Sequence, residues 1–385
     1  MRSKFLPFAQ PVIGEEEIAA VIDTLRSDWI TTGPKTQAFG RRFAEFVGSK
    51  SALPLNSCTA GLHTSLVALG IGPGDEVITT PMTFAASVNV IEHVGARPIL
   101  VDVEPDTLNI DPARVKDAVT SRTKAIIPVH FAGHPVELDA IMDIARMHNL
   151  HVIEDAAHAL AAKYRGRMIG SGDNPAAFSF YATKNLTTSE GGALTGNDAF
   201  LAKAGVISLH GMTRDAWKRY GKGGSWFYEI ALPGFKYNMT DIQAAIGMCQ
   251  LDKLAAFQKR RSEIVRHYNR AFADLGMFDV PVERKHIEHA WHLYILRLKL
   301  AAFRFDRARF IEEMTARKIG CSVHFIPIHI HPYYRNKYHF EPDDFPVAYK
   351  EYQRLVSLPL HPRLTDADVQ DVIEAVLDIV EKFRC

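Results

Sequence analysis

The sequence has little of what marks a secreted or membrane protein. It contains four cysteines, Cys58, Cys249, Cys321 and Cys385, scattered without a metal-like pair. Such cysteines are typical of reduced thiols in a cytoplasm and argue against a disulfide framework. No stretch is long and apolar enough to span a bilayer, and the first residues lack the continuous apolar region of a signal peptide. We therefore expect a cytoplasmic protein.

An excess of charge of one sign is also missing. The formal net charge is +1 at pH 7, so nothing in the composition indicates a nucleic acid or an anionic membrane as partner. Hydrophobic residues make up 47% of the chain, which is typical of a folded protein and argues against disorder. A length of 385 residues exceeds what one core usually serves, so two domains are expected.

Strand and helix patterns alternate between residues 51 and 155. Apolar strand-like runs lie at 51–56, 75–80, 97–103, 124–131 and 150–155, and helical patterns lie at 57–70, 84–95, 111–120 and 137–149. Several of the strands are apolar throughout, as in a sheet covered by helices on both faces. The alternation predicts a mostly parallel, doubly wound α/β layer.

Helical patterns also precede and follow this region. Residues 14–28 place Ile18, Val21, Ile22 and Leu25 on one face of a helix. Residues 251–276 form a long amphipathic pattern that is a plausible bridge between domains. The chain closes with a helix that begins at a Thr365-Asp368 capping pair. The last third is thus predicted to be a smaller α+β domain.

The chemistry is concentrated in residues 151–196. Asp155 ends an apolar run, and roughly thirty residues later Lys184 follows a second run, "AAFSFYA". A carboxylate and a lysine at the tips of neighbouring strands suggest a site for pyridoxal 5′-phosphate (PLP), with the aldehyde held by the lysine as a Schiff base and the pyridine nitrogen paired with the carboxylate. Each has an ordinary alternative: a salt bridge or helix cap for Asp155, and a solvated surface position for Lys184.

Two further strand ends carry suitable groups. Cys58 and Thr59 begin a helix directly after a strand, where free N–H groups and the helix dipole favour a phosphate. Phe84 begins the next such helix, and its ring could stack on a flat cofactor. The ordinary alternatives are an N-cap and core packing.

Residues around Asp155 and Lys184 complete this set. His158, one turn after Asp155, could orient that carboxylate or contact the ring, whereas Glu154 alternates to the opposite face of the strand. Ser179 flanks the second strand end, and Gly191-Gly192 allow a close backbone approach.

Several longer segments resemble one family. They are "WITTGPKTQAF", "LGIGPGDEVITTPMTF", "VIEDAAHA", "FSFYATKNLTTSEGGALTG", "GFKYNMTDIQAAIG", "VHFIPIHIHPYY" and "LVSLPLHPRLTDADV". They run along nearly the whole chain, which resembles the sugar aminotransferases of the DegT/DnrJ/EryC1/StrS type, PLP enzymes of fold type I. The resemblance implies a large PLP-binding domain at residues 1–250, with a mostly parallel sheet between helices, and a small C-terminal α+β domain at residues 251–385.

The resemblance also assigns roles. Lys184 matches the Schiff-base lysine and Asp155 the partner of the pyridine nitrogen; the other matching positions are Phe84 for ring stacking, His158 near the ring, and Cys58, Thr59 and Ser179 for the phosphate. The family often has Ser-Gly-Thr where this chain has Ser57-Cys58-Thr59. One branch replaces the lysine by histidine and performs dehydration, so Lys184 favours transamination.

The resemblance further implies a homodimer with shared active sites. In this family the phosphate also receives a group from the other subunit, and Asn238 or, as the second choice, Lys236 is the matching residue. The amino donor is glutamate, and the acceptor is a nucleotide-linked keto sugar, most often a 4-keto-6-deoxy sugar. The product is an amino sugar for surface polysaccharide, glycan or natural-product biosynthesis.

Substrate contacts are expected from Thr32 and Gly33 and from His324 and His329. A metal site at His324, His329 and His331 is the competing interpretation, disfavoured because no acidic residue lies nearby. A basic loop at residues 210–229 could attract the diphosphate through Arg214, Lys218 and Arg219, or be a solvated loop.

Other functions remain open on the same fold. The acceptor could be a 3-keto sugar or a keto-cyclitol. A PLP-dependent lyase or dehydratase and a non-catalytic regulator are the alternatives from other classes; the set of Lys184, Asp155 and Thr59 argues against the regulator.

Overall fold

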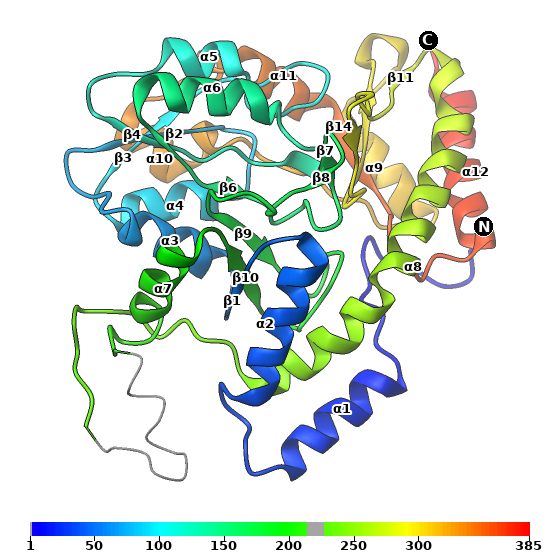
Figure 1. The fold of residues 1–385 in the computed structure, drawn as a ribbon. Helices are drawn as coiled ribbons and strands as arrows, with labels where there is room; N and C mark the ends of the chain where they lie inside the picture. The colour runs from blue at the N-terminus through cyan, green and yellow to red at the C-terminus, as the bar shows by residue number, and fades with distance from the viewer. Residues whose placement is uncertain (1, 214–226) are drawn as a thin grey trace.

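The computed structural model describes residues 2–213 and 227–385. Arg214, Lys218 and Arg219 of the predicted basic loop lie outside these residues. Within the described part of the chain, no helix is both long and apolar enough to cross a membrane. Figure 1 shows a sheet in the middle of the larger part of the molecule, with helices packed around it.

The strands are short. They are β1 (Ala52–Leu55), β2 (Glu76–Thr79), β3 (Arg97–Leu100), β4 (Thr123–Ile126), β5 (His151–Val152), β6 (Glu154–Asp155), β7 (Lys163–Tyr164), β8 (Arg167–Met168), β9 (Ala176–Ser179), β10 (Gly192–Thr195), β11 (Phe278–Asp279), β12 (Ile287–Glu288), β13 (Tyr294–Leu298) and β14 (Leu355–Leu358). The strands expected from the alternating region are therefore present.

The helices begin and end largely where the sequence predicts. They are α1 (Glu15–Arg26), α2 (Pro34–Val47), α3 (Cys58–Ala68), α4 (Ala86–His93), α5 (Pro112–Asp117), α6 (Leu138–His148), α7 (Asp198–Ile207), α8 (Asp241–Phe272), α9 (Arg307–Ala316), α10 (Pro332–Tyr338), α11 (Pro346–Arg354) and α12 (Asp366–Phe383). The capping pair predicted for the last helix is confirmed, since Thr365 accepts from the Asp368 N–H and the Asp368 carboxylate accepts from the Thr365 N–H.

The central sheet is built from two four-stranded halves that meet at residues 151–155. One half has the order β3-β2-β4-β5 and is parallel throughout, and the other has the order β1-β10-β9-β6. The Asp155 N–H donates to the Pro128 carbonyl at 2.9 Å, and Asp155 forms a parallel bridge with Val129. The mostly parallel sheet is thus confirmed; β10 runs antiparallel to both of its neighbours.

Helices cover both faces of this sheet. In β9, Ala177 packs with α3 and α7, whereas Phe178, the next residue, packs with α2 and α8. In β2, Val77 and Ile78 likewise belong to clusters on opposite faces. Because neighbouring side chains of a strand point to opposite faces, this burial explains why the strands read as continuous apolar runs.

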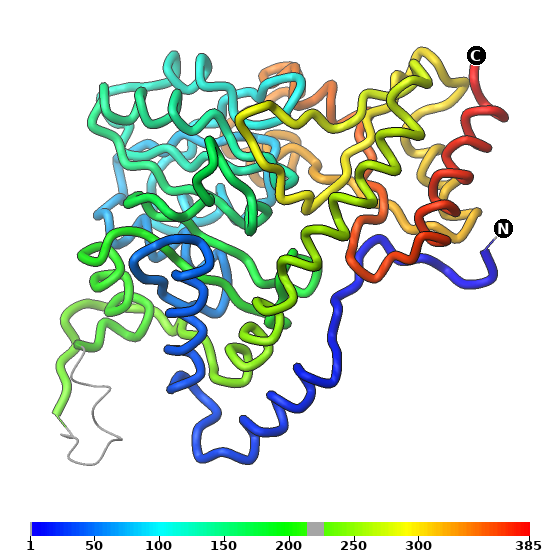
Figure 2. The backbone as a smooth tube through the Cα atoms, turned by 45° about the vertical axis from the view of Figure 1, so that its right-hand side comes forward, coloured from blue at the N-terminus to red at the C-terminus, as the bar shows by residue number. Residues whose placement is uncertain are grey.

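Helix α8 joins the two predicted domains. Leu251 and Leu254 pack into the core around α2 and β9, and Tyr268 and Phe272 pack into a second core with β13, β14 and α12. Figure 2 shows this helix running from one part of the molecule to the other. The predicted boundary at residue 250 therefore falls inside a continuous helix. The N-terminal segment returns to the second core, since Leu6 bonds to Lys318 and Gly320.

The helix expected near the N-terminus is present as α1, but its apolar stripe is not buried. Ile18, Ile22 and Leu25 are 44%, 42% and 57% exposed. The helix packs on α8 through its other face, where the Glu17 carboxylate accepts from Lys253 Nζ at 2.8 Å. An exposed apolar stripe of this kind indicates a contact surface.

The aromatic cluster between α2 and β9 gives a stability prediction. Phe43 is fully buried, with its ring centroid 5.1 Å from that of Phe178 and 5.3 Å from that of Phe180. We expect Phe43→Ala to lower the free energy of unfolding by about 3–5 kcal/mol, because it removes a buried ring and leaves a cavity. Urea unfolding of the cofactor-free protein measures it. Met147→Ala, at a side chain that is 69% exposed, should change it by less than about 0.5 kcal/mol; equal losses would contradict the packing described.

Candidate active site

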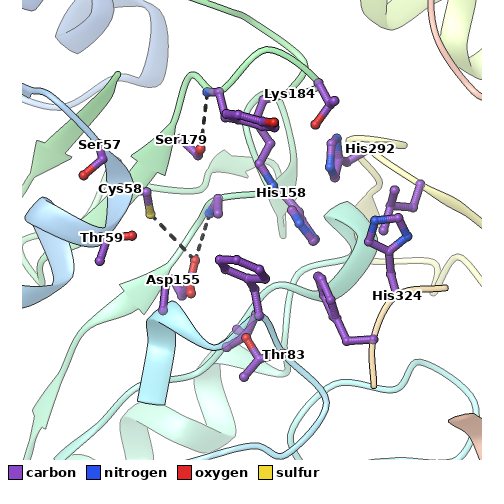
Figure 3. Close-up of a pocket in the computed structure, with 18 of the residues that line it drawn as sticks. Ser57, Cys58, Thr59, Thr83, Asp155, His158, Ser179, Lys184, His292 and His324 are labelled. Atoms are coloured by element: carbon purple, nitrogen blue, oxygen red, sulfur yellow. Dashed lines mark hydrogen bonds between the residues drawn. The ribbon is translucent and has the colours of Figure 1, made fainter. Parts of the chain in front are cut away.

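A cavity of about 610 Å³ opens where β6 and β9 end, beside the first turns of α3 and α4. Its lining brings together eight of the residues predicted from the sequence: Cys58, Thr59, Phe84, Asp155, His158, Ser179, Lys184 and His324. Figure 3 labels all of these except Phe84 and shows them around one space, with Asp155 and Lys184 on different sides of it. His324 and Phe325, from the segment between α9 and α10, form another part of the wall.

Asp155 is a buried carboxylate fixed by several donors. It is 5% exposed, and its Oδ2 accepts from the Ser87 hydroxyl at 2.7 Å while its Oδ1 accepts from the Ala157 N–H at 3.1 Å. Its neighbour Glu154 points to the other face of the sheet, as predicted, where Oε2 lies 2.9 Å from His130 Nε2. The strand thus presents one carboxylate, and not two, to the cavity.

Lys184 lies in the loop after β9, and its backbone N–H donates to the Tyr181 carbonyl at 2.9 Å. The side chain is half-buried in the cavity wall. Desolvation lowers the pKa of Lys184 to about 8, opposed by the nearby Cys58 and Asp155. A large fraction of the amine is therefore neutral near pH 8, as a nucleophile and base requires.

The first turn of α3 provides an anion site. Ser57 is the N-cap and accepts from the Ala60 N–H, so the N–H groups of Cys58 and Thr59 lie beyond the helix hydrogen bonds. A Cβ on Gly192 would lie 2.4 Å from the Ser57 carbonyl carbon and 2.6 Å from the Cys58 nitrogen. Only glycine therefore lets β10 lie against this turn.

The Cys58 thiol does not take part in this anion site. Its Sγ lies 3.3 Å from the Ala177 carbonyl and 3.9 Å from Asp155 Oδ1. Burial and the neighbouring Asp155 raise the pKa of the thiol well above its usual range. Cys58 is thus a neutral donor, and its part in phosphate binding would be through its backbone N–H.

Comparisons with known proteins agree with this geometry. The profile of the DegT/DnrJ/EryC1/StrS aminotransferase family matches residues 11–377. The chain belongs to this family. It is 51% identical over 382 residues to the spore coat polysaccharide biosynthesis protein SpsC of Bacillus subtilis, covering 99% of this chain and 98% of SpsC.

Solved structures give the same result. The PLP form of the Streptococcus pneumoniae sugar aminotransferase Spr1654 is 36% identical, with a TM-score of 0.90 over 98% of this chain and 99% of that one. Helicobacter pylori PseC, an aminotransferase in pseudoaminic acid biosynthesis, is 30% identical, with a TM-score of 0.91 over 99% of this chain and 100% of PseC. The predicted family, fold, enzyme class and cofactor are confirmed.

The cavity fits PLP in three places. The free N–H groups at the start of α3 match a phosphate, and the buried Asp155 carboxylate matches a protonated ring nitrogen. Phe84 is 66% exposed although it lines the cavity, so its ring offers a flat apolar face. In an apolar cavity wall, such an uncovered ring is suited to a stacked aromatic ligand.

Three histidines, His158, His292 and His324, line the cavity. The ring centroids of His158 and His292 lie 4.3 Å apart, and His158 stacks on Phe325 at 5.8 Å. Burial, together with the positive charge of Lys184, lowers the pKa values of His158 and His292 well below their usual range and that of His324 to about 4. The imidazoles are therefore neutral at physiological pH.

Some lining residues were missed in the sequence. His292 shares a hydrogen bond of 3.1 Å between its Nδ1 and Asn185 Oδ1, next to Lys184, but nothing near it in the sequence carried a motif. Two further residues were missed as well: Ser87 donates to Asp155, and Thr83, which lines the cavity, contacts Ser87. Ser87 lies in the first turn of α4, and Thr83 lies in the bend before that helix, so neither residue stands in a motif that the sequence analysis could use.

Four predicted residues lie elsewhere. Asn238 donates to the Thr32 hydroxyl at 2.5 Å, and both line a second cavity of about 620 Å³ between α2 and α7. The Gly33 N–H donates to the Asp241 carboxylate at 2.8 Å. His329 is fully buried against Phe345 and does not line the first cavity. In the described residues, no group of three or more His, Cys, Asp or Glu side chains could hold a metal ion.

The pKa of Lys184 can be tested in the cofactor-free protein. We expect acetylation of this amine by a trace of acetic anhydride to rise with pH with a midpoint near 8, because only the neutral amine reacts. Mass spectrometry of the peptide that contains Lys184 gives the midpoint, against about 10.4 for a free lysine side chain. Asp155→Asn should move it lower, since the carboxylate favours the ammonium form. A midpoint near 10 in the native protein would contradict the desolvated site.

Proposed function

We propose that this enzyme transfers the amino group of glutamate to a nucleotide-linked keto sugar, in most cases a 4-keto-6-deoxy sugar, and releases an amino sugar. The observation that carries the proposal is that Lys184 and Asp155 face one cavity whose third wall is the free N-terminus of α3. By their descriptions, SpsC acts in spore coat polysaccharide biosynthesis and PseC in the biosynthesis of pseudoaminic acid, which supports a similar use here. The scattered thiols support a cytoplasmic location.

The residues of the cavity have separate tasks. When bound, PLP supplies an aldehyde that joins covalently to amines and a ring that withdraws electrons. Lys184 is the only amine in the described lining, so its Nζ is the group that holds the cofactor and then accepts the α-proton of the amino donor. Asp155 holds a proton at the ring nitrogen, and the N–H groups of Cys58 and Thr59, with Ser179, bind the phosphate.

The rest of the cavity suits a sugar. Its volume of about 610 Å³ lies in the range of small-molecule sites. His324 is held through Nδ1 by the Ser357 hydroxyl at 2.8 Å, and as a neutral imidazole it can bond to a sugar hydroxyl through Nε2. A charged side chain at this place would cost more to desolvate than a neutral one.

We also propose a homodimer in which each active site is completed by the partner. Asn238 and Thr32 lie at a second cavity of their own subunit, apart from Lys184, as expected if they serve the site of the other subunit. The exposed stripe of Ile18, Ile22 and Leu25 on α1 offers apolar area for a subunit contact. A closed two-fold dimer would use these surfaces twice.

The amino-transfer proposal is tested by colour and by product. Purified protein with PLP should be yellow and lose this colour on addition of glutamate alone, because the amino group moves to the cofactor. NMR of the products with a panel of nucleotide-linked keto sugars should then show one aminated sugar. Lys184→Ala should abolish both results. Bleaching without amination of any keto sugar would favour a keto-cyclitol acceptor, and no bleaching would favour a dehydratase or a non-catalytic regulator.

Shared sites are tested by complementation. Lys184→Ala and Asn238→Ala subunits should each be weakly active or inactive alone. In a hybrid dimer one site carries both changes and the other carries neither. Mixing and subunit exchange should therefore restore activity to roughly a quarter of the native value, the statistical share of intact sites. The absence of any gain, with hybrids verified by native mass spectrometry, would show that Asn238 acts within its own subunit.

A further inference from the structure

Asp155 has more hydrogen-bond support than an isolated ring-nitrogen partner would require. Its Oδ2 accepts from the Ser87 hydroxyl at 2.7 Å, and its Oδ1 accepts from the Ala157 N–H at 3.1 Å, while the Cys58 Sγ lies 3.9 Å from Oδ1 and closer, at 3.3 Å, to the Ala177 carbonyl. Figure 3 shows the contact between Cys58 and Asp155. The bond from Ser87 is the shorter of the two hydrogen bonds and the one made by a hydroxyl.

Ser87 is itself supported by a second hydroxyl. Thr83 Oγ1 lies 2.7 Å from Ser87 Oγ, and both side chains are buried, at 2% and 0% exposure. A hydroxyl has one proton to donate. Since an ionised carboxylate can only accept, Ser87 donates to Asp155, and Thr83 must then donate to Ser87. The two protons are therefore ordered in one direction, from Thr83 through Ser87 to the Asp155 carboxylate.

The two hydroxyls are not explained by the needs of the helix they begin. Ser87 lies in the first turn of α4, but its contact with the Phe84 carbonyl is long, at 3.4 Å, whereas its contact with Asp155 is short. A capping serine would accept a hydrogen bond from a backbone N–H. Ser87 instead donates its hydroxyl proton to the carboxylate of Asp155, which lies 68 residues away in the sequence. The arrangement serves the carboxylate.

We propose that Ser87 and Thr83 are positioning residues: a two-hydroxyl relay that fixes the rotation of the Asp155 carboxylate and keeps it an acceptor toward the ring nitrogen of PLP. The inference rests on the proposed role of Asp155. Its physical basis is that ordered donors on one oxygen stop the carboxylate from turning, so no reorganisation is needed when the ring nitrogen is held protonated.

The test measures cofactor binding and colour, not only turnover. Ser87→Ala should bind PLP about tenfold more weakly in equilibrium dialysis, the size expected for one lost hydrogen bond to a charged group. The pH midpoint of the visible absorption change of the bound cofactor should move upward, because a less firmly protonated ring withdraws fewer electrons. Thr83→Val should shift both readouts in the same direction and by less, and Thr83→Ser, which keeps the hydroxyl, should restore them.

Ser65→Ala is the matched control. Ser65 is also a fully buried helix serine, but its hydroxyl donates to the backbone carbonyl of Gly61 at 2.7 Å and does not line the cavity. The Ser65→Ala variant should keep the native PLP affinity and the native pH midpoint of the absorption change. Equal losses in Ser65→Ala and Ser87→Ala would overturn the proposal, as would native affinity and midpoint in Ser87→Ala. If Ser87→Ala does not fold, the comparison of Thr83→Val with Thr83→Ser tests the proposal instead, because only Thr83→Val removes a hydroxyl of the relay.

The outcome is separable from the proposed function. If the native protein binds no PLP, or if Lys184→Ala binds PLP equally well, the proposed function itself is contradicted. If native protein binds PLP through Lys184 but Ser87→Ala and Thr83→Val keep the native affinity and pH midpoint, only the proposed relay is contradicted.

Discussion

The parallel pairing of residues 151–155 between β4 and β9 is the constraint on which the site depends. The Asp155 N–H is bonded to Pro128 on one side, and the next N–H, that of Ala156, is bonded to Ala177 on the other. This pairing joins the two halves of the sheet and fixes the backbone that carries the carboxylate. The ends of the neighbouring strands then bring the start of α3, the start of α4 and the Lys184 loop to the same edge.

Much of the fold could be predicted from the sequence, because the local hydrophobic pattern and the long-range packing agree. The apolar runs at 124–131 and 150–155 are strands covered on both faces, and the helix stops and caps lie close to the predicted positions. The stripe on α1 shows where the pattern is insufficient. The periodicity of Ile18, Ile22 and Leu25 predicts a helix, but it does not say whether the apolar face meets its own core or another molecule.

The residues of the site likewise fall into those that the sequence predicts and those that it does not. Asp155, Lys184 and Cys58-Thr59 follow from the rule that ligands bind at the carboxyl ends of strands. His292 and Ser87 could not be ranked beforehand, because their importance comes from contacts across 107 and 68 residues of chain. His324 and His329 look alike in one histidine-rich segment, and only the packing of His329 under Phe345 distinguishes the lining residue from the core residue.

Helix α8 has a mechanical consequence. Its 32 residues would span about 48 Å at 1.5 Å per residue, and they carry side chains of two hydrophobic cores without an interruption. Turning one core against the other about residue 250, the predicted domain boundary, would break backbone hydrogen bonds in mid-helix. Because this continuous helix connects the two cores, we expect it to limit changes in the width of the cavity between Lys184 and His324.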